Sequence, residues 1–437
     1  MEKNQLPKDW KWVKLGEFVI SVKGKKPKRV SKEKTKECSI PYVNIKAFEK
    51  NIIDEYTDGV GCALCEDGDF LMVWDGSRSG YVGKAIKGAI GSTLVKLNFP
   101  DIENNYAYYF LQSKFIEINT RAKGVGIPHV DPNILWNYDL LIPPKPIQQA
   151  IVSKIEELFS EIENGIKSLF TAKEQLKKYR QSVLKWAFEG KLANGLNGDL
   201  YDLPDEHDLS IAAEPETEYR VERNQNNQKN HSSDKREMPE GWKWVKLGEI
   251  SQSVLGKMLD RQKNEGALKP YLRNINVRWN EFKLDDIFEM RFQENEDERF
   301  GIVKGDLIIC EGGEPGRAAI WKGQIQNMKI QKALHRVRFN KSACAEYFLY
   351  YLNLISSTKL LDQYFTGTTI KHLTGQSLKN ISIPLAPIRE QNIIVQAIES
   401  RLSVADKMEE SITESLQQAE ALKQSILKKA FKGKLIK

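Results

Sequence analysis

The sequence of 437 residues has few cysteines and no long apolar run. Five cysteines, an odd and sparse set, argue against a disulfide framework and indicate a reducing compartment. No stretch approaches the roughly 18 uninterrupted apolar residues of a membrane-spanning helix, and the first residues lack the apolar segment of a signal peptide. The sequence therefore predicts a soluble protein of the cytoplasm.

Diagnostic catalytic motifs are also absent. The chain contains neither Asn-Pro-Pro-Tyr nor Asp-Pro-Pro-Tyr, the motifs of adenine methylation, and no convincing carboxylate set of a nuclease. Residues 80–85 end in Gly-Lys-Ala but lack the spacing and the Ser or Thr of a phosphate-binding loop. Cys62 and Cys65 have a metal-like spacing, but no second pair or histidine cluster accompanies them. We therefore expect a non-catalytic chain that binds no metal or cofactor itself.

The charge of the chain is unevenly distributed. The net charge is +7, but residues 194–237 hold eleven acidic and five basic residues, a local charge of −6. The rest of the chain then carries +13, which indicates a polyanionic partner such as nucleic acid. Ordinary solubility charge explains this excess equally well. The polar stretch 194–237 is predicted to be a mobile linker.

A long helix is predicted over 147–193. Eleven positions between 151 and 186 are spaced alternately by four and three residues, and only Gly165 among them is not apolar. The mean spacing of 3.5 residues is that of a left-handed coiled-coil seam, about 54 Å long. Pro143, Pro144 and Pro146 before it and Gly190 after it are helix start and stop signals. So long a seam needs an equally long partner, and Gly165 is where we expect any bend.

The chain is a tandem duplication, which supplies that partner. Five segments recur in the same order at offsets of 229 to 243 residues: 6–17 with 238–249, 41–43 with 270–272, 68–71 with 305–308, 124–147 with 367–388, and 181–192 with 424–435. Moving the first seam by 243 residues places a second helix within 388–437, with eight of eleven seam positions apolar. A flexible linker of 44 residues spans about 35 Å, less than the helix length, so an antiparallel pair is favoured over a parallel one.

Each repeat begins with a globular domain, over 1–146 and 238–387. Residues 70–74 and 307–310 are predicted to be buried strands, and 107–118 and 344–354 short helices. The predicted fold is α/β (mixed α+β): two homologous globular domains, related by pseudo-twofold symmetry, at opposite ends of a two-helix antiparallel coiled coil.

These features together resemble the DNA-specificity subunit of type I restriction-modification systems. The Trp-x-x-x-x-Leu-Gly-Glu openings at Trp10 and Trp242 are typical of the target-recognition domains of that family. Ile-Pro-Pro at 142–144 and Ala-Phe-Glu-Gly-Lys-Leu at 187–192 frame its first conserved helix. Gln148-Gln149 replaces the commoner Glu-Gln that Glu390-Gln391 keeps, and the second helix has three polar seam positions.

The resemblance implies a function and a set of partners. Each target-recognition domain reads one half of a split, asymmetric site in double-stranded DNA, and the helix pair fixes the unread spacer. Two modification subunits, which hold S-adenosylmethionine, methylate adenine, and two ATP-dependent restriction subunits, which need Mg²⁺, complete the cleaving complex of a prokaryotic cell. Two rival hypotheses are a single-chain nucleic-acid enzyme with a divergent site and a coiled-coil scaffold without a DNA role.

Candidate DNA contacts are a basic cluster around Pro27, basic residues beside the glycine-rich turns, and planar side chains of the second domain. Those predicted to contact phosphate are Lys23, Lys25, Lys26, Lys28, Arg29, Arg78, Lys84 and Arg317. Those suited to guanine and adenine edges are Arg273, Asn274, Asn276 and Arg278. A solvated surface is the alternative for all of them.

Two further sets recur in both repeats. His129 and His372, with the nearby basic residues Arg121, Lys123 and Lys371, are interpreted first as local hydrogen-bonding groups and second as DNA contacts. Trp186, Phe188 and Phe431 near the helix tips are candidate contacts for the modification subunits. Packing against the neighbouring globular domain explains these aromatic residues equally well.

Overall fold

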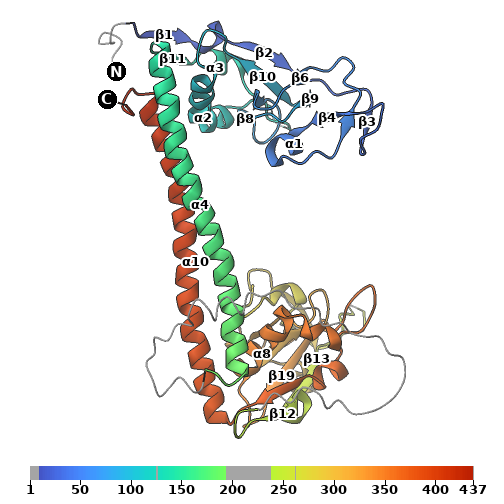
Figure 1. Cartoon of the computed structure of the whole chain (residues 1–437). Coiled ribbons are helices and arrows are strands. Elements are labelled where there is room, and N and C mark those ends of the chain that lie inside the picture. Colours follow the sequence, from blue (N-terminus) through green and yellow to red (C-terminus); the bar gives the residue numbers. More distant parts are fainter. Residues whose placement is uncertain (1–8, 125, 193–237, 261, 437) are drawn as a thin grey trace. The chain divides into compact units, whose positions relative to one another are not determined.

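The computed structural model describes residues 9–124, 126–192, 238–260 and 262–436. They divide into two compact units (Figure 1). Unit 1 comprises Met1–Phe170 with Thr413–Lys437, and unit 2 comprises Thr171–Ile412. Each unit therefore combines one globular domain with a segment of both repeats. The predicted linker 194–237 and the beginning of the first opening motif, residues 6–8, lie outside the described residues.

The globular domain of unit 1 is built from three small sheets and a few helices. Their strand orders are β1(Lys11–Lys14)-β11(Asp139–Ile142), β2(Ile20–Lys23)-β10(Leu94–Asn98)-β7(Phe70–Val73)-β8(Val82–Lys84), and β3(Val30–Ser31)-β5(Tyr56–Thr57)-β4(Ile40–Val43)-β9(Gly88–Ile90)-β6(Leu64–Cys65). The helices are η1(Leu15–Glu17), α1(Ile45–Lys50), α2(Asn104–Thr120) and α3(Pro132–Trp136).

The globular domain of unit 2 repeats this plan. Its strand orders are β12(Lys243–Lys246)-β20(Ser382–Leu385), β13(Ser251–Leu255)-β19(Leu334–Phe339)-β16(Leu307–Cys310)-β17(Ala318–Ile320), and β15(Phe288–Phe292)-β14(Ala267–Leu272)-β18(Lys329–Ile330). Its helices are α6(Leu247–Ile250), η3(Asn274–Asn276), η4(Glu294–Glu296), α7(Asp297–Phe300), α8(Ala345–Ser357), η5(Leu360–Tyr364) and α9(Gly375–Lys379). The parallel pair β4 with β9 recurs as β14 with β18, so the duplication extends to the topology.

The central strand of each domain is buried on both faces, which explains its continuous apolar sequence. In β7, Phe70 and Met72 pack in the cluster that contains α2, and Leu71 and Val73 pack in the cluster that contains β4 and β9. In β16, the alternate residues divide in the same way between α8 and the β14 sheet. The strands and helices predicted at 70–74, 307–310, 107–118 and 344–354 are confirmed as β7, β16, α2 and α8.

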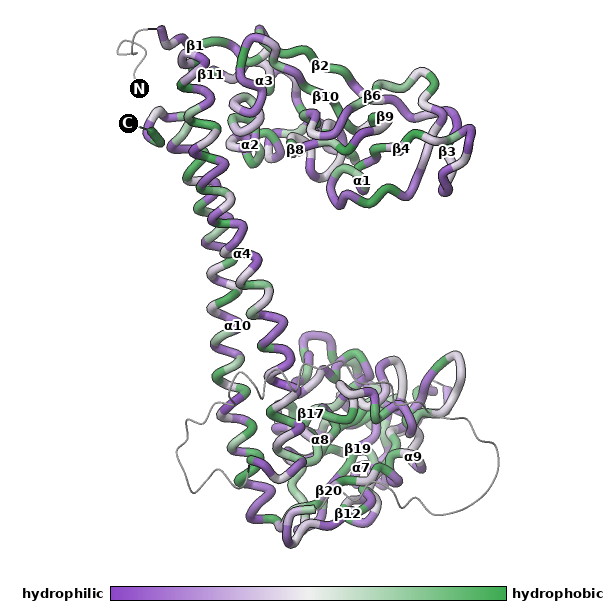
Figure 2. The backbone as a smooth tube through the Cα atoms, in the orientation of Figure 1, coloured by the Kyte–Doolittle hydropathy of each residue, from purple (hydrophilic) through white to green (hydrophobic). Residues whose placement is uncertain are grey.

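Two long helices, α4(Lys145–Phe188) and α10(Ile388–Ala430), are also confirmed. Both are drawn in Figure 2 as tubes in which hydrophobic and hydrophilic residues alternate. Helix α4 begins directly after Pro144, and Pro146 lies in its first turn, where a missing N–H costs nothing. It ends before Gly190, whose φ of 77° is the left-handed conformation of a helix end. None of the helices in the described ranges is both long enough and apolar enough to cross a membrane.

The helix segments within each unit run antiparallel, as expected. In unit 1 the early residues Ile151 and Ile155 of α4 share a core with the late residues Ile426 and Leu427 of α10. In unit 2 the late residues Val183 and Ala187 of α4 share a core with the early residues Ile394 and Ile398 of α10. An early segment of one helix thus meets a late segment of the other in both units.

The predicted seam residues are buried or half-buried in α4 at every position except Gly165, and in α10 at every position except Met408, Leu422 and Lys429. Gly165 is exposed, and its neighbour Ile166 is half-buried in its place. In α10, the predicted seam residues Met408 and Leu422 are 53% and 50% exposed. At each exception the next residue along the helix is less exposed, and after Gly165, Met408 and Leu422 the burial returns to the predicted positions. Helix α4 continues through Gly165 without interruption.

The substitution Gly165→Ala should raise the free energy of unfolding by up to about 1 kcal/mol, because a methyl group meets no atom there and alanine favours helix. Gly190→Ala is the matched control, because Gly190 has positive φ and a Cβ atom would overlap the Pro239 ring. It should destabilise the chain. Urea unfolding followed by circular dichroism compares the two variants, and equal destabilisation by both would contradict an open site at Gly165.

Candidate nucleic-acid interface

A glycine-rich turn and a hairpin meet in each globular domain, and we call this meeting point the loop corner. In the first domain it comprises residues 74–80, 122–124 and 126–130. The Val130 N–H donates to Trp74 O at 2.9 Å, and the Gly76 N–H donates to Pro128 O at 2.8 Å. Lys123 and His129 bridge the hairpin through paired backbone hydrogen bonds of 2.9 and 2.7 Å. Backbone hydrogen bonds therefore join two segments of the corner that lie about 50 residues apart in sequence.

The second domain builds the same corner from residues 311–317 and 366–373. The Leu373 N–H donates to Glu311 O at 2.7 Å, which matches the bond between Val130 and Trp74. Thr366 and His372 bridge the hairpin as Lys123 and His129 do. Buried His335 lies 2.9 Å from Leu373 O through its Nε2, and burial lowers the pKa of this histidine. Both histidines that the sequence singled out therefore lie at a loop corner.

Residues 23–29 of the first domain, which we call the basic loop, are held by backbone hydrogen bonds that leave three lysine side chains free. The Gly24 N–H donates to Leu94 O at 2.9 Å, and the Lys25 N–H donates to Ile90 O at 3.2 Å. The side chains of Lys25, Lys26 and Lys28 are exposed and have no hydrogen bond or ion pair with another described residue. These lysines are the candidates best placed to meet a phosphate.

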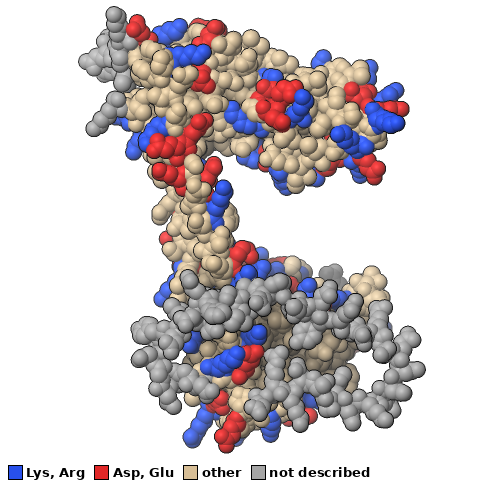
Figure 3. Space-filling model, in the orientation of Figure 1, with Lys and Arg blue, Asp and Glu red and all other residues tan. Residues whose placement is uncertain are grey.

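Two other basic residues of this loop have acidic neighbours. Lys23 Nζ lies 3.0 Å from Asp75 of the loop corner, which connects the loop to the corner. Arg29 is exposed and lies 3.9 Å from Glu37, a distance at which the pair contributes little. On the face drawn in Figure 3, basic and acidic side chains are interspersed over the globular part of unit 1. The excess positive charge does not form one continuous patch on that face.

The remaining basic candidates of the first domain already have partners. Arg78 lies 3.2 Å from Glu49 and stacks 4.0 Å from the Tyr81 ring centre. Lys84 donates to Asn105 at 2.6 Å, and burial lowers the pKa of its ammonium group. Arg78 keeps much of its surface exposed, but Lys84 mainly fastens β8 to α2.

Two basic residues near the first hairpin are exposed but paired. Arg121 lies 3.4 Å from Glu117, one helical turn earlier. Lys123 lies 2.7 Å from Asp131, and its hydrogen bond lowers the pKa of that carboxyl. In the second domain Lys371 has a similar partner, Asp362, at 2.9 Å. Arg121 and Lys371 could exchange their partly exposed partners for a phosphate at little cost, whereas Asp131 is buried and holds Lys123 in place.

The planar candidates of the second domain differ in their availability. Asn276 is only 2% exposed and donates to the backbone of Lys283 and Asp286 at 3.0 Å each, so its amide holds the loop and is not presented to a ligand. Asn274 accepts from Arg317 at 2.7 Å and donates to Gly312 O. The prediction that Asn276 offers its edge to a base is corrected by its burial.

Arg317, Arg273 and Arg278 also lie beside this corner. Arg317 is mostly buried, because Glu314 and Asn274 take its guanidinium donors. Arg273 pairs with Asp286 at 2.6 Å. Arg278 is half-buried and donates to Val277 O at 3.2 Å, which leaves most of its guanidinium group unpaired among described residues. His372 is exposed at the same corner.

The aromatic helix tips pack inside the units, as the alternative interpretation holds. Phe188 lies 4.9 Å from the Tyr347 ring centre and 5.1 Å from that of Tyr351. Phe431 lies 5.1 Å from Tyr106 and 5.4 Å from Phe110. Trp186 is half-buried against the same core as Phe188. These aromatic side chains therefore pack within the chain. Each long helix completes the globular domain of the other repeat.

Two buried glutamines at the helix starts were not recognised as equivalent from the sequence. Gln148 Oε1 accepts from the Glu103 N–H, and its Nε2 donates to Pro143 O, both at 2.8 Å. Gln391 binds the Cys344 N–H at 3.0 Å and Ala386 O at 2.8 Å in the same way. Gln148 therefore corresponds to Gln391, and Ile147, not Gln148, stands at the position of Glu390. The offset of 243 residues that relates the two long helices gives this alignment from the sequence.

Metal binding finds no support in the described ranges, where no three His, Cys, Asp or Glu side chains are grouped to hold an ion. Cys65 is buried, and its thiol lies 3.4 Å from Gly88 O. Burial raises the pKa of the Cys65 thiol to about 11, which disfavours the thiolate that a metal needs.

Comparison with known proteins gives a consistent picture. Residues 7–170 and 239–418 match the family model described as type I restriction modification DNA specificity domain. The MjaVIII specificity subunit of a type I restriction enzyme from Methanocaldococcus jannaschii is 25% identical over 99% of this chain and 94% of the relative.

Two solved structures share the fold. A chain from a study of complex assembly and conformational transition of the type I R-M system has a TM-score of 0.68 at 20% identity, over 99% of this chain and 100% of that chain. The HsdS subunit from Thermoanaerobacter tengcongensis has a TM-score of 0.52, also at 20% identity, over 99% of both chains.

The substitution Gln148→Leu should lower the free energy of unfolding by about 1–3 kcal/mol, because a backbone donor and a backbone acceptor lose their buried partner. Gln149→Leu is the matched control, since the neighbouring glutamine is exposed. It should change stability by no more than about 0.5 kcal/mol. Urea unfolding followed by tryptophan fluorescence measures both, and equal effects would exclude a specific role for Gln148.

Proposed function

Since the chain belongs to the family of type I restriction-modification DNA specificity proteins, we propose that each globular domain reads one half of a split, asymmetric site in double-stranded DNA. The observation that carries this proposal is the repeated loop corner, which presents different side chains in the two domains. Both corners hold a histidine, but the first has free lysines in the adjoining basic loop, and the second has Arg278. One scaffold with two different sets of side chains suits two different half-sites.

The two long helices are proposed to set the length of the unread spacer. Helix α4 has 44 residues, so its axis is about 66 Å long. Bipartite DNA readers need their two modules at a fixed separation and helical phase. A continuous helix supplies a stiffer connection than a flexible linker does, and ion pairs such as Arg180–Asp406 and Lys423–Glu163 link it to α10 within each unit.

Specificity subunits are non-catalytic, so the chemistry belongs to other chains. The chain is proposed to bind two modification subunits, which hold S-adenosylmethionine, and two restriction subunits, which use ATP and Mg²⁺, in the cytoplasm of a prokaryotic cell. The similarity to a chain from a study of complex assembly of the type I R-M system supports such partners. The surfaces for these partners lie elsewhere than Phe188 and Phe431, which are packed within the units.

The central test is an exchange of one domain. Residues 1–146 are replaced by the first domain of another family member, with Tyr106 and Phe110 kept so that Phe431 still packs. Sequencing of the adenines methylated by the assembled complex should show one changed half-site, with the other half and the spacer unchanged.

Exchange of 238–387 is the matched control and should change only the other half. A change of both halves by either exchange would contradict independent readers. The isolated chain should neither methylate nor cut DNA, and methyl transfer by it alone would instead favour a single-chain enzyme.

The triple substitution Lys25→Ser, Lys26→Ser and Lys28→Ser should weaken DNA binding and flatten its salt dependence. Each phosphate contact contributes about 0.9 to the slope of log binding constant against log salt, so the slope should fall by up to roughly 2.7. Filter binding at several salt concentrations measures it on specific and random duplexes. Both should weaken alike, because phosphate contacts carry no sequence information.

Lys304→Ser, Lys322→Ser and Lys341→Ser together form the charge-matched control. These exposed lysines lie at the end of the β16 sheet opposite the loop corner of the second domain. They should leave the slope unchanged. An equal loss in both triple variants would mean that only net charge matters.

A further inference from the structure

A groove of about 680 Å³ crosses the small sheet of the second domain. Its floor is the surface of β14 and β15. One wall is the loop 258–260 with Asn264, and the other is formed by Arg273 and Phe288. This volume is typical of sites that take a small flat molecule or one residue of a polymer.

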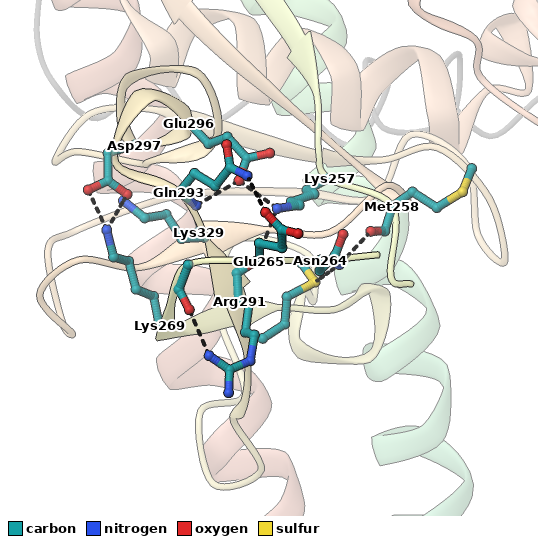
Figure 4. A network of polar contacts seen from close by, with 12 residues as sticks. Lys257, Met258, Asn264, Glu265, Lys269, Arg291, Gln293, Glu296, Asp297 and Lys329 are labelled. Atoms are coloured by element: carbon teal, nitrogen blue, oxygen red, sulfur yellow. Dashed lines mark hydrogen bonds and ion pairs between the residues drawn. The ribbon is translucent and has the colours of Figure 1, made fainter. Parts of the chain in front are cut away.

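The walls of the groove are held in place by polar contacts (Figure 4). Asn264 donates to Met258 O at 3.0 Å, which closes the loop on itself. Lys257 joins this loop to β15 through Arg291 O at 3.0 Å, and it pairs with Glu296 at 2.5 Å. Arg291 donates from one guanidinium nitrogen to Gly266 O at 2.9 Å. The groove is therefore formed before any ligand arrives.

An exposed aromatic ring lies at the rim of this groove. Phe288 is 48% exposed. The guanidinium of Arg273 lies 3.7 Å from the centre of the Phe288 ring, and Asp286 fixes that guanidinium at 2.6 Å. Part of the ring is thus supported by Arg273, and the exposed part is a ready surface for stacking.

The polar groups of the lining suit a neutral ring with donors and acceptors on its edge. The side chain of Gln331 has no hydrogen bond among the described residues, and Arg291 has a second guanidinium nitrogen without one. Two arginines in the lining are balanced by Asp260 and Glu289. A balanced charge does not attract phosphate, but planar amide and guanidinium groups are the partners that base edges use.

The groove adjoins the loop corner of the second domain. Arg273 lines the groove, and the next residue, Asn274, donates to Gly312 O in the glycine-rich turn. A DNA strand that contacts the corner therefore passes the mouth of the groove. Resting on the function proposed above, we propose that the groove holds one nucleobase of the second half-site, turned out of the stack and placed against Phe288.

Base-by-base fluorescence on the full chain, without other subunits, tests this proposal. The target duplex is the site found by sequencing the methylated adenines. One base of it at a time is replaced by a fluorescent analogue, 2-aminopurine or pyrrolocytosine. One position in the second half-site should brighten on binding, because a base that leaves the stack loses its quenching neighbours. Phe288→Ala should abolish that signal and weaken binding of the target duplex about tenfold.

Three further variants make the result specific. Phe288→Tyr keeps the ring and should keep the signal, and Gln331→Ala should reduce it without touching the ring. Val303→Ala changes another exposed apolar residue of the same domain and should have no effect. Circular dichroism melting confirms that each variant is folded.

The possible outcomes separate the two proposals. Specific binding of the target duplex with no bright position, or with a bright position that persists in Phe288→Ala, overturns the groove proposal and leaves the reading function intact. Equal binding of target and random duplexes overturns both.

Discussion

The rest of the structure depends on one kind of contact, the insertion of each helix tip into the globular domain of the other repeat. Phe188 packs on Tyr347 in unit 2, and Phe431 packs on Tyr106 in unit 1. Removing a buried phenylalanine such as Phe188 typically costs about 3–5 kcal/mol. Neither unit is contiguous in sequence as a result, and the antiparallel direction of the helices follows, because each helix must end where the other begins.

This arrangement separates the residues that stabilise the fold from the residues proposed to read DNA. Buried strands β7 and β16, the glutamines Gln148 and Gln391, and the helix tips form a common frame in both repeats. The loop corners rest on that frame through a few backbone hydrogen bonds, such as Val130 to Trp74, so their side chains can vary without cost to the core. A family whose members must read different DNA sites is well served by such a division.

The long helices show which structural properties a sequence pattern can predict. Their existence, limits and direction could be predicted, because apolar spacing, prolines, glycines and linker length are local or additive properties. Most positions of the seam could be predicted too, but the exceptions could not, because Gly165 and Ile166, or Met408 and Glu409, are both acceptable at a period near 3.5. Only the packing of the two helices decides between such neighbouring residues. The aromatic tips were likewise ambiguous between an external partner and the other domain.

The sequence by itself determined the duplication, the mixed α/β class, the two central strands and the family, since each rests on the order and spacing of residues along the chain. The tertiary structure decided which candidate side chains remain available to a ligand. Asn276 is closed off, Arg317 is taken by Asn274 forty-three residues away, and Lys25, Lys26 and Lys28 stay free. The physical reason is that hydrogen-bond and ion-pair partners come from distant segments, whose meeting depends on the fold and not on local pattern.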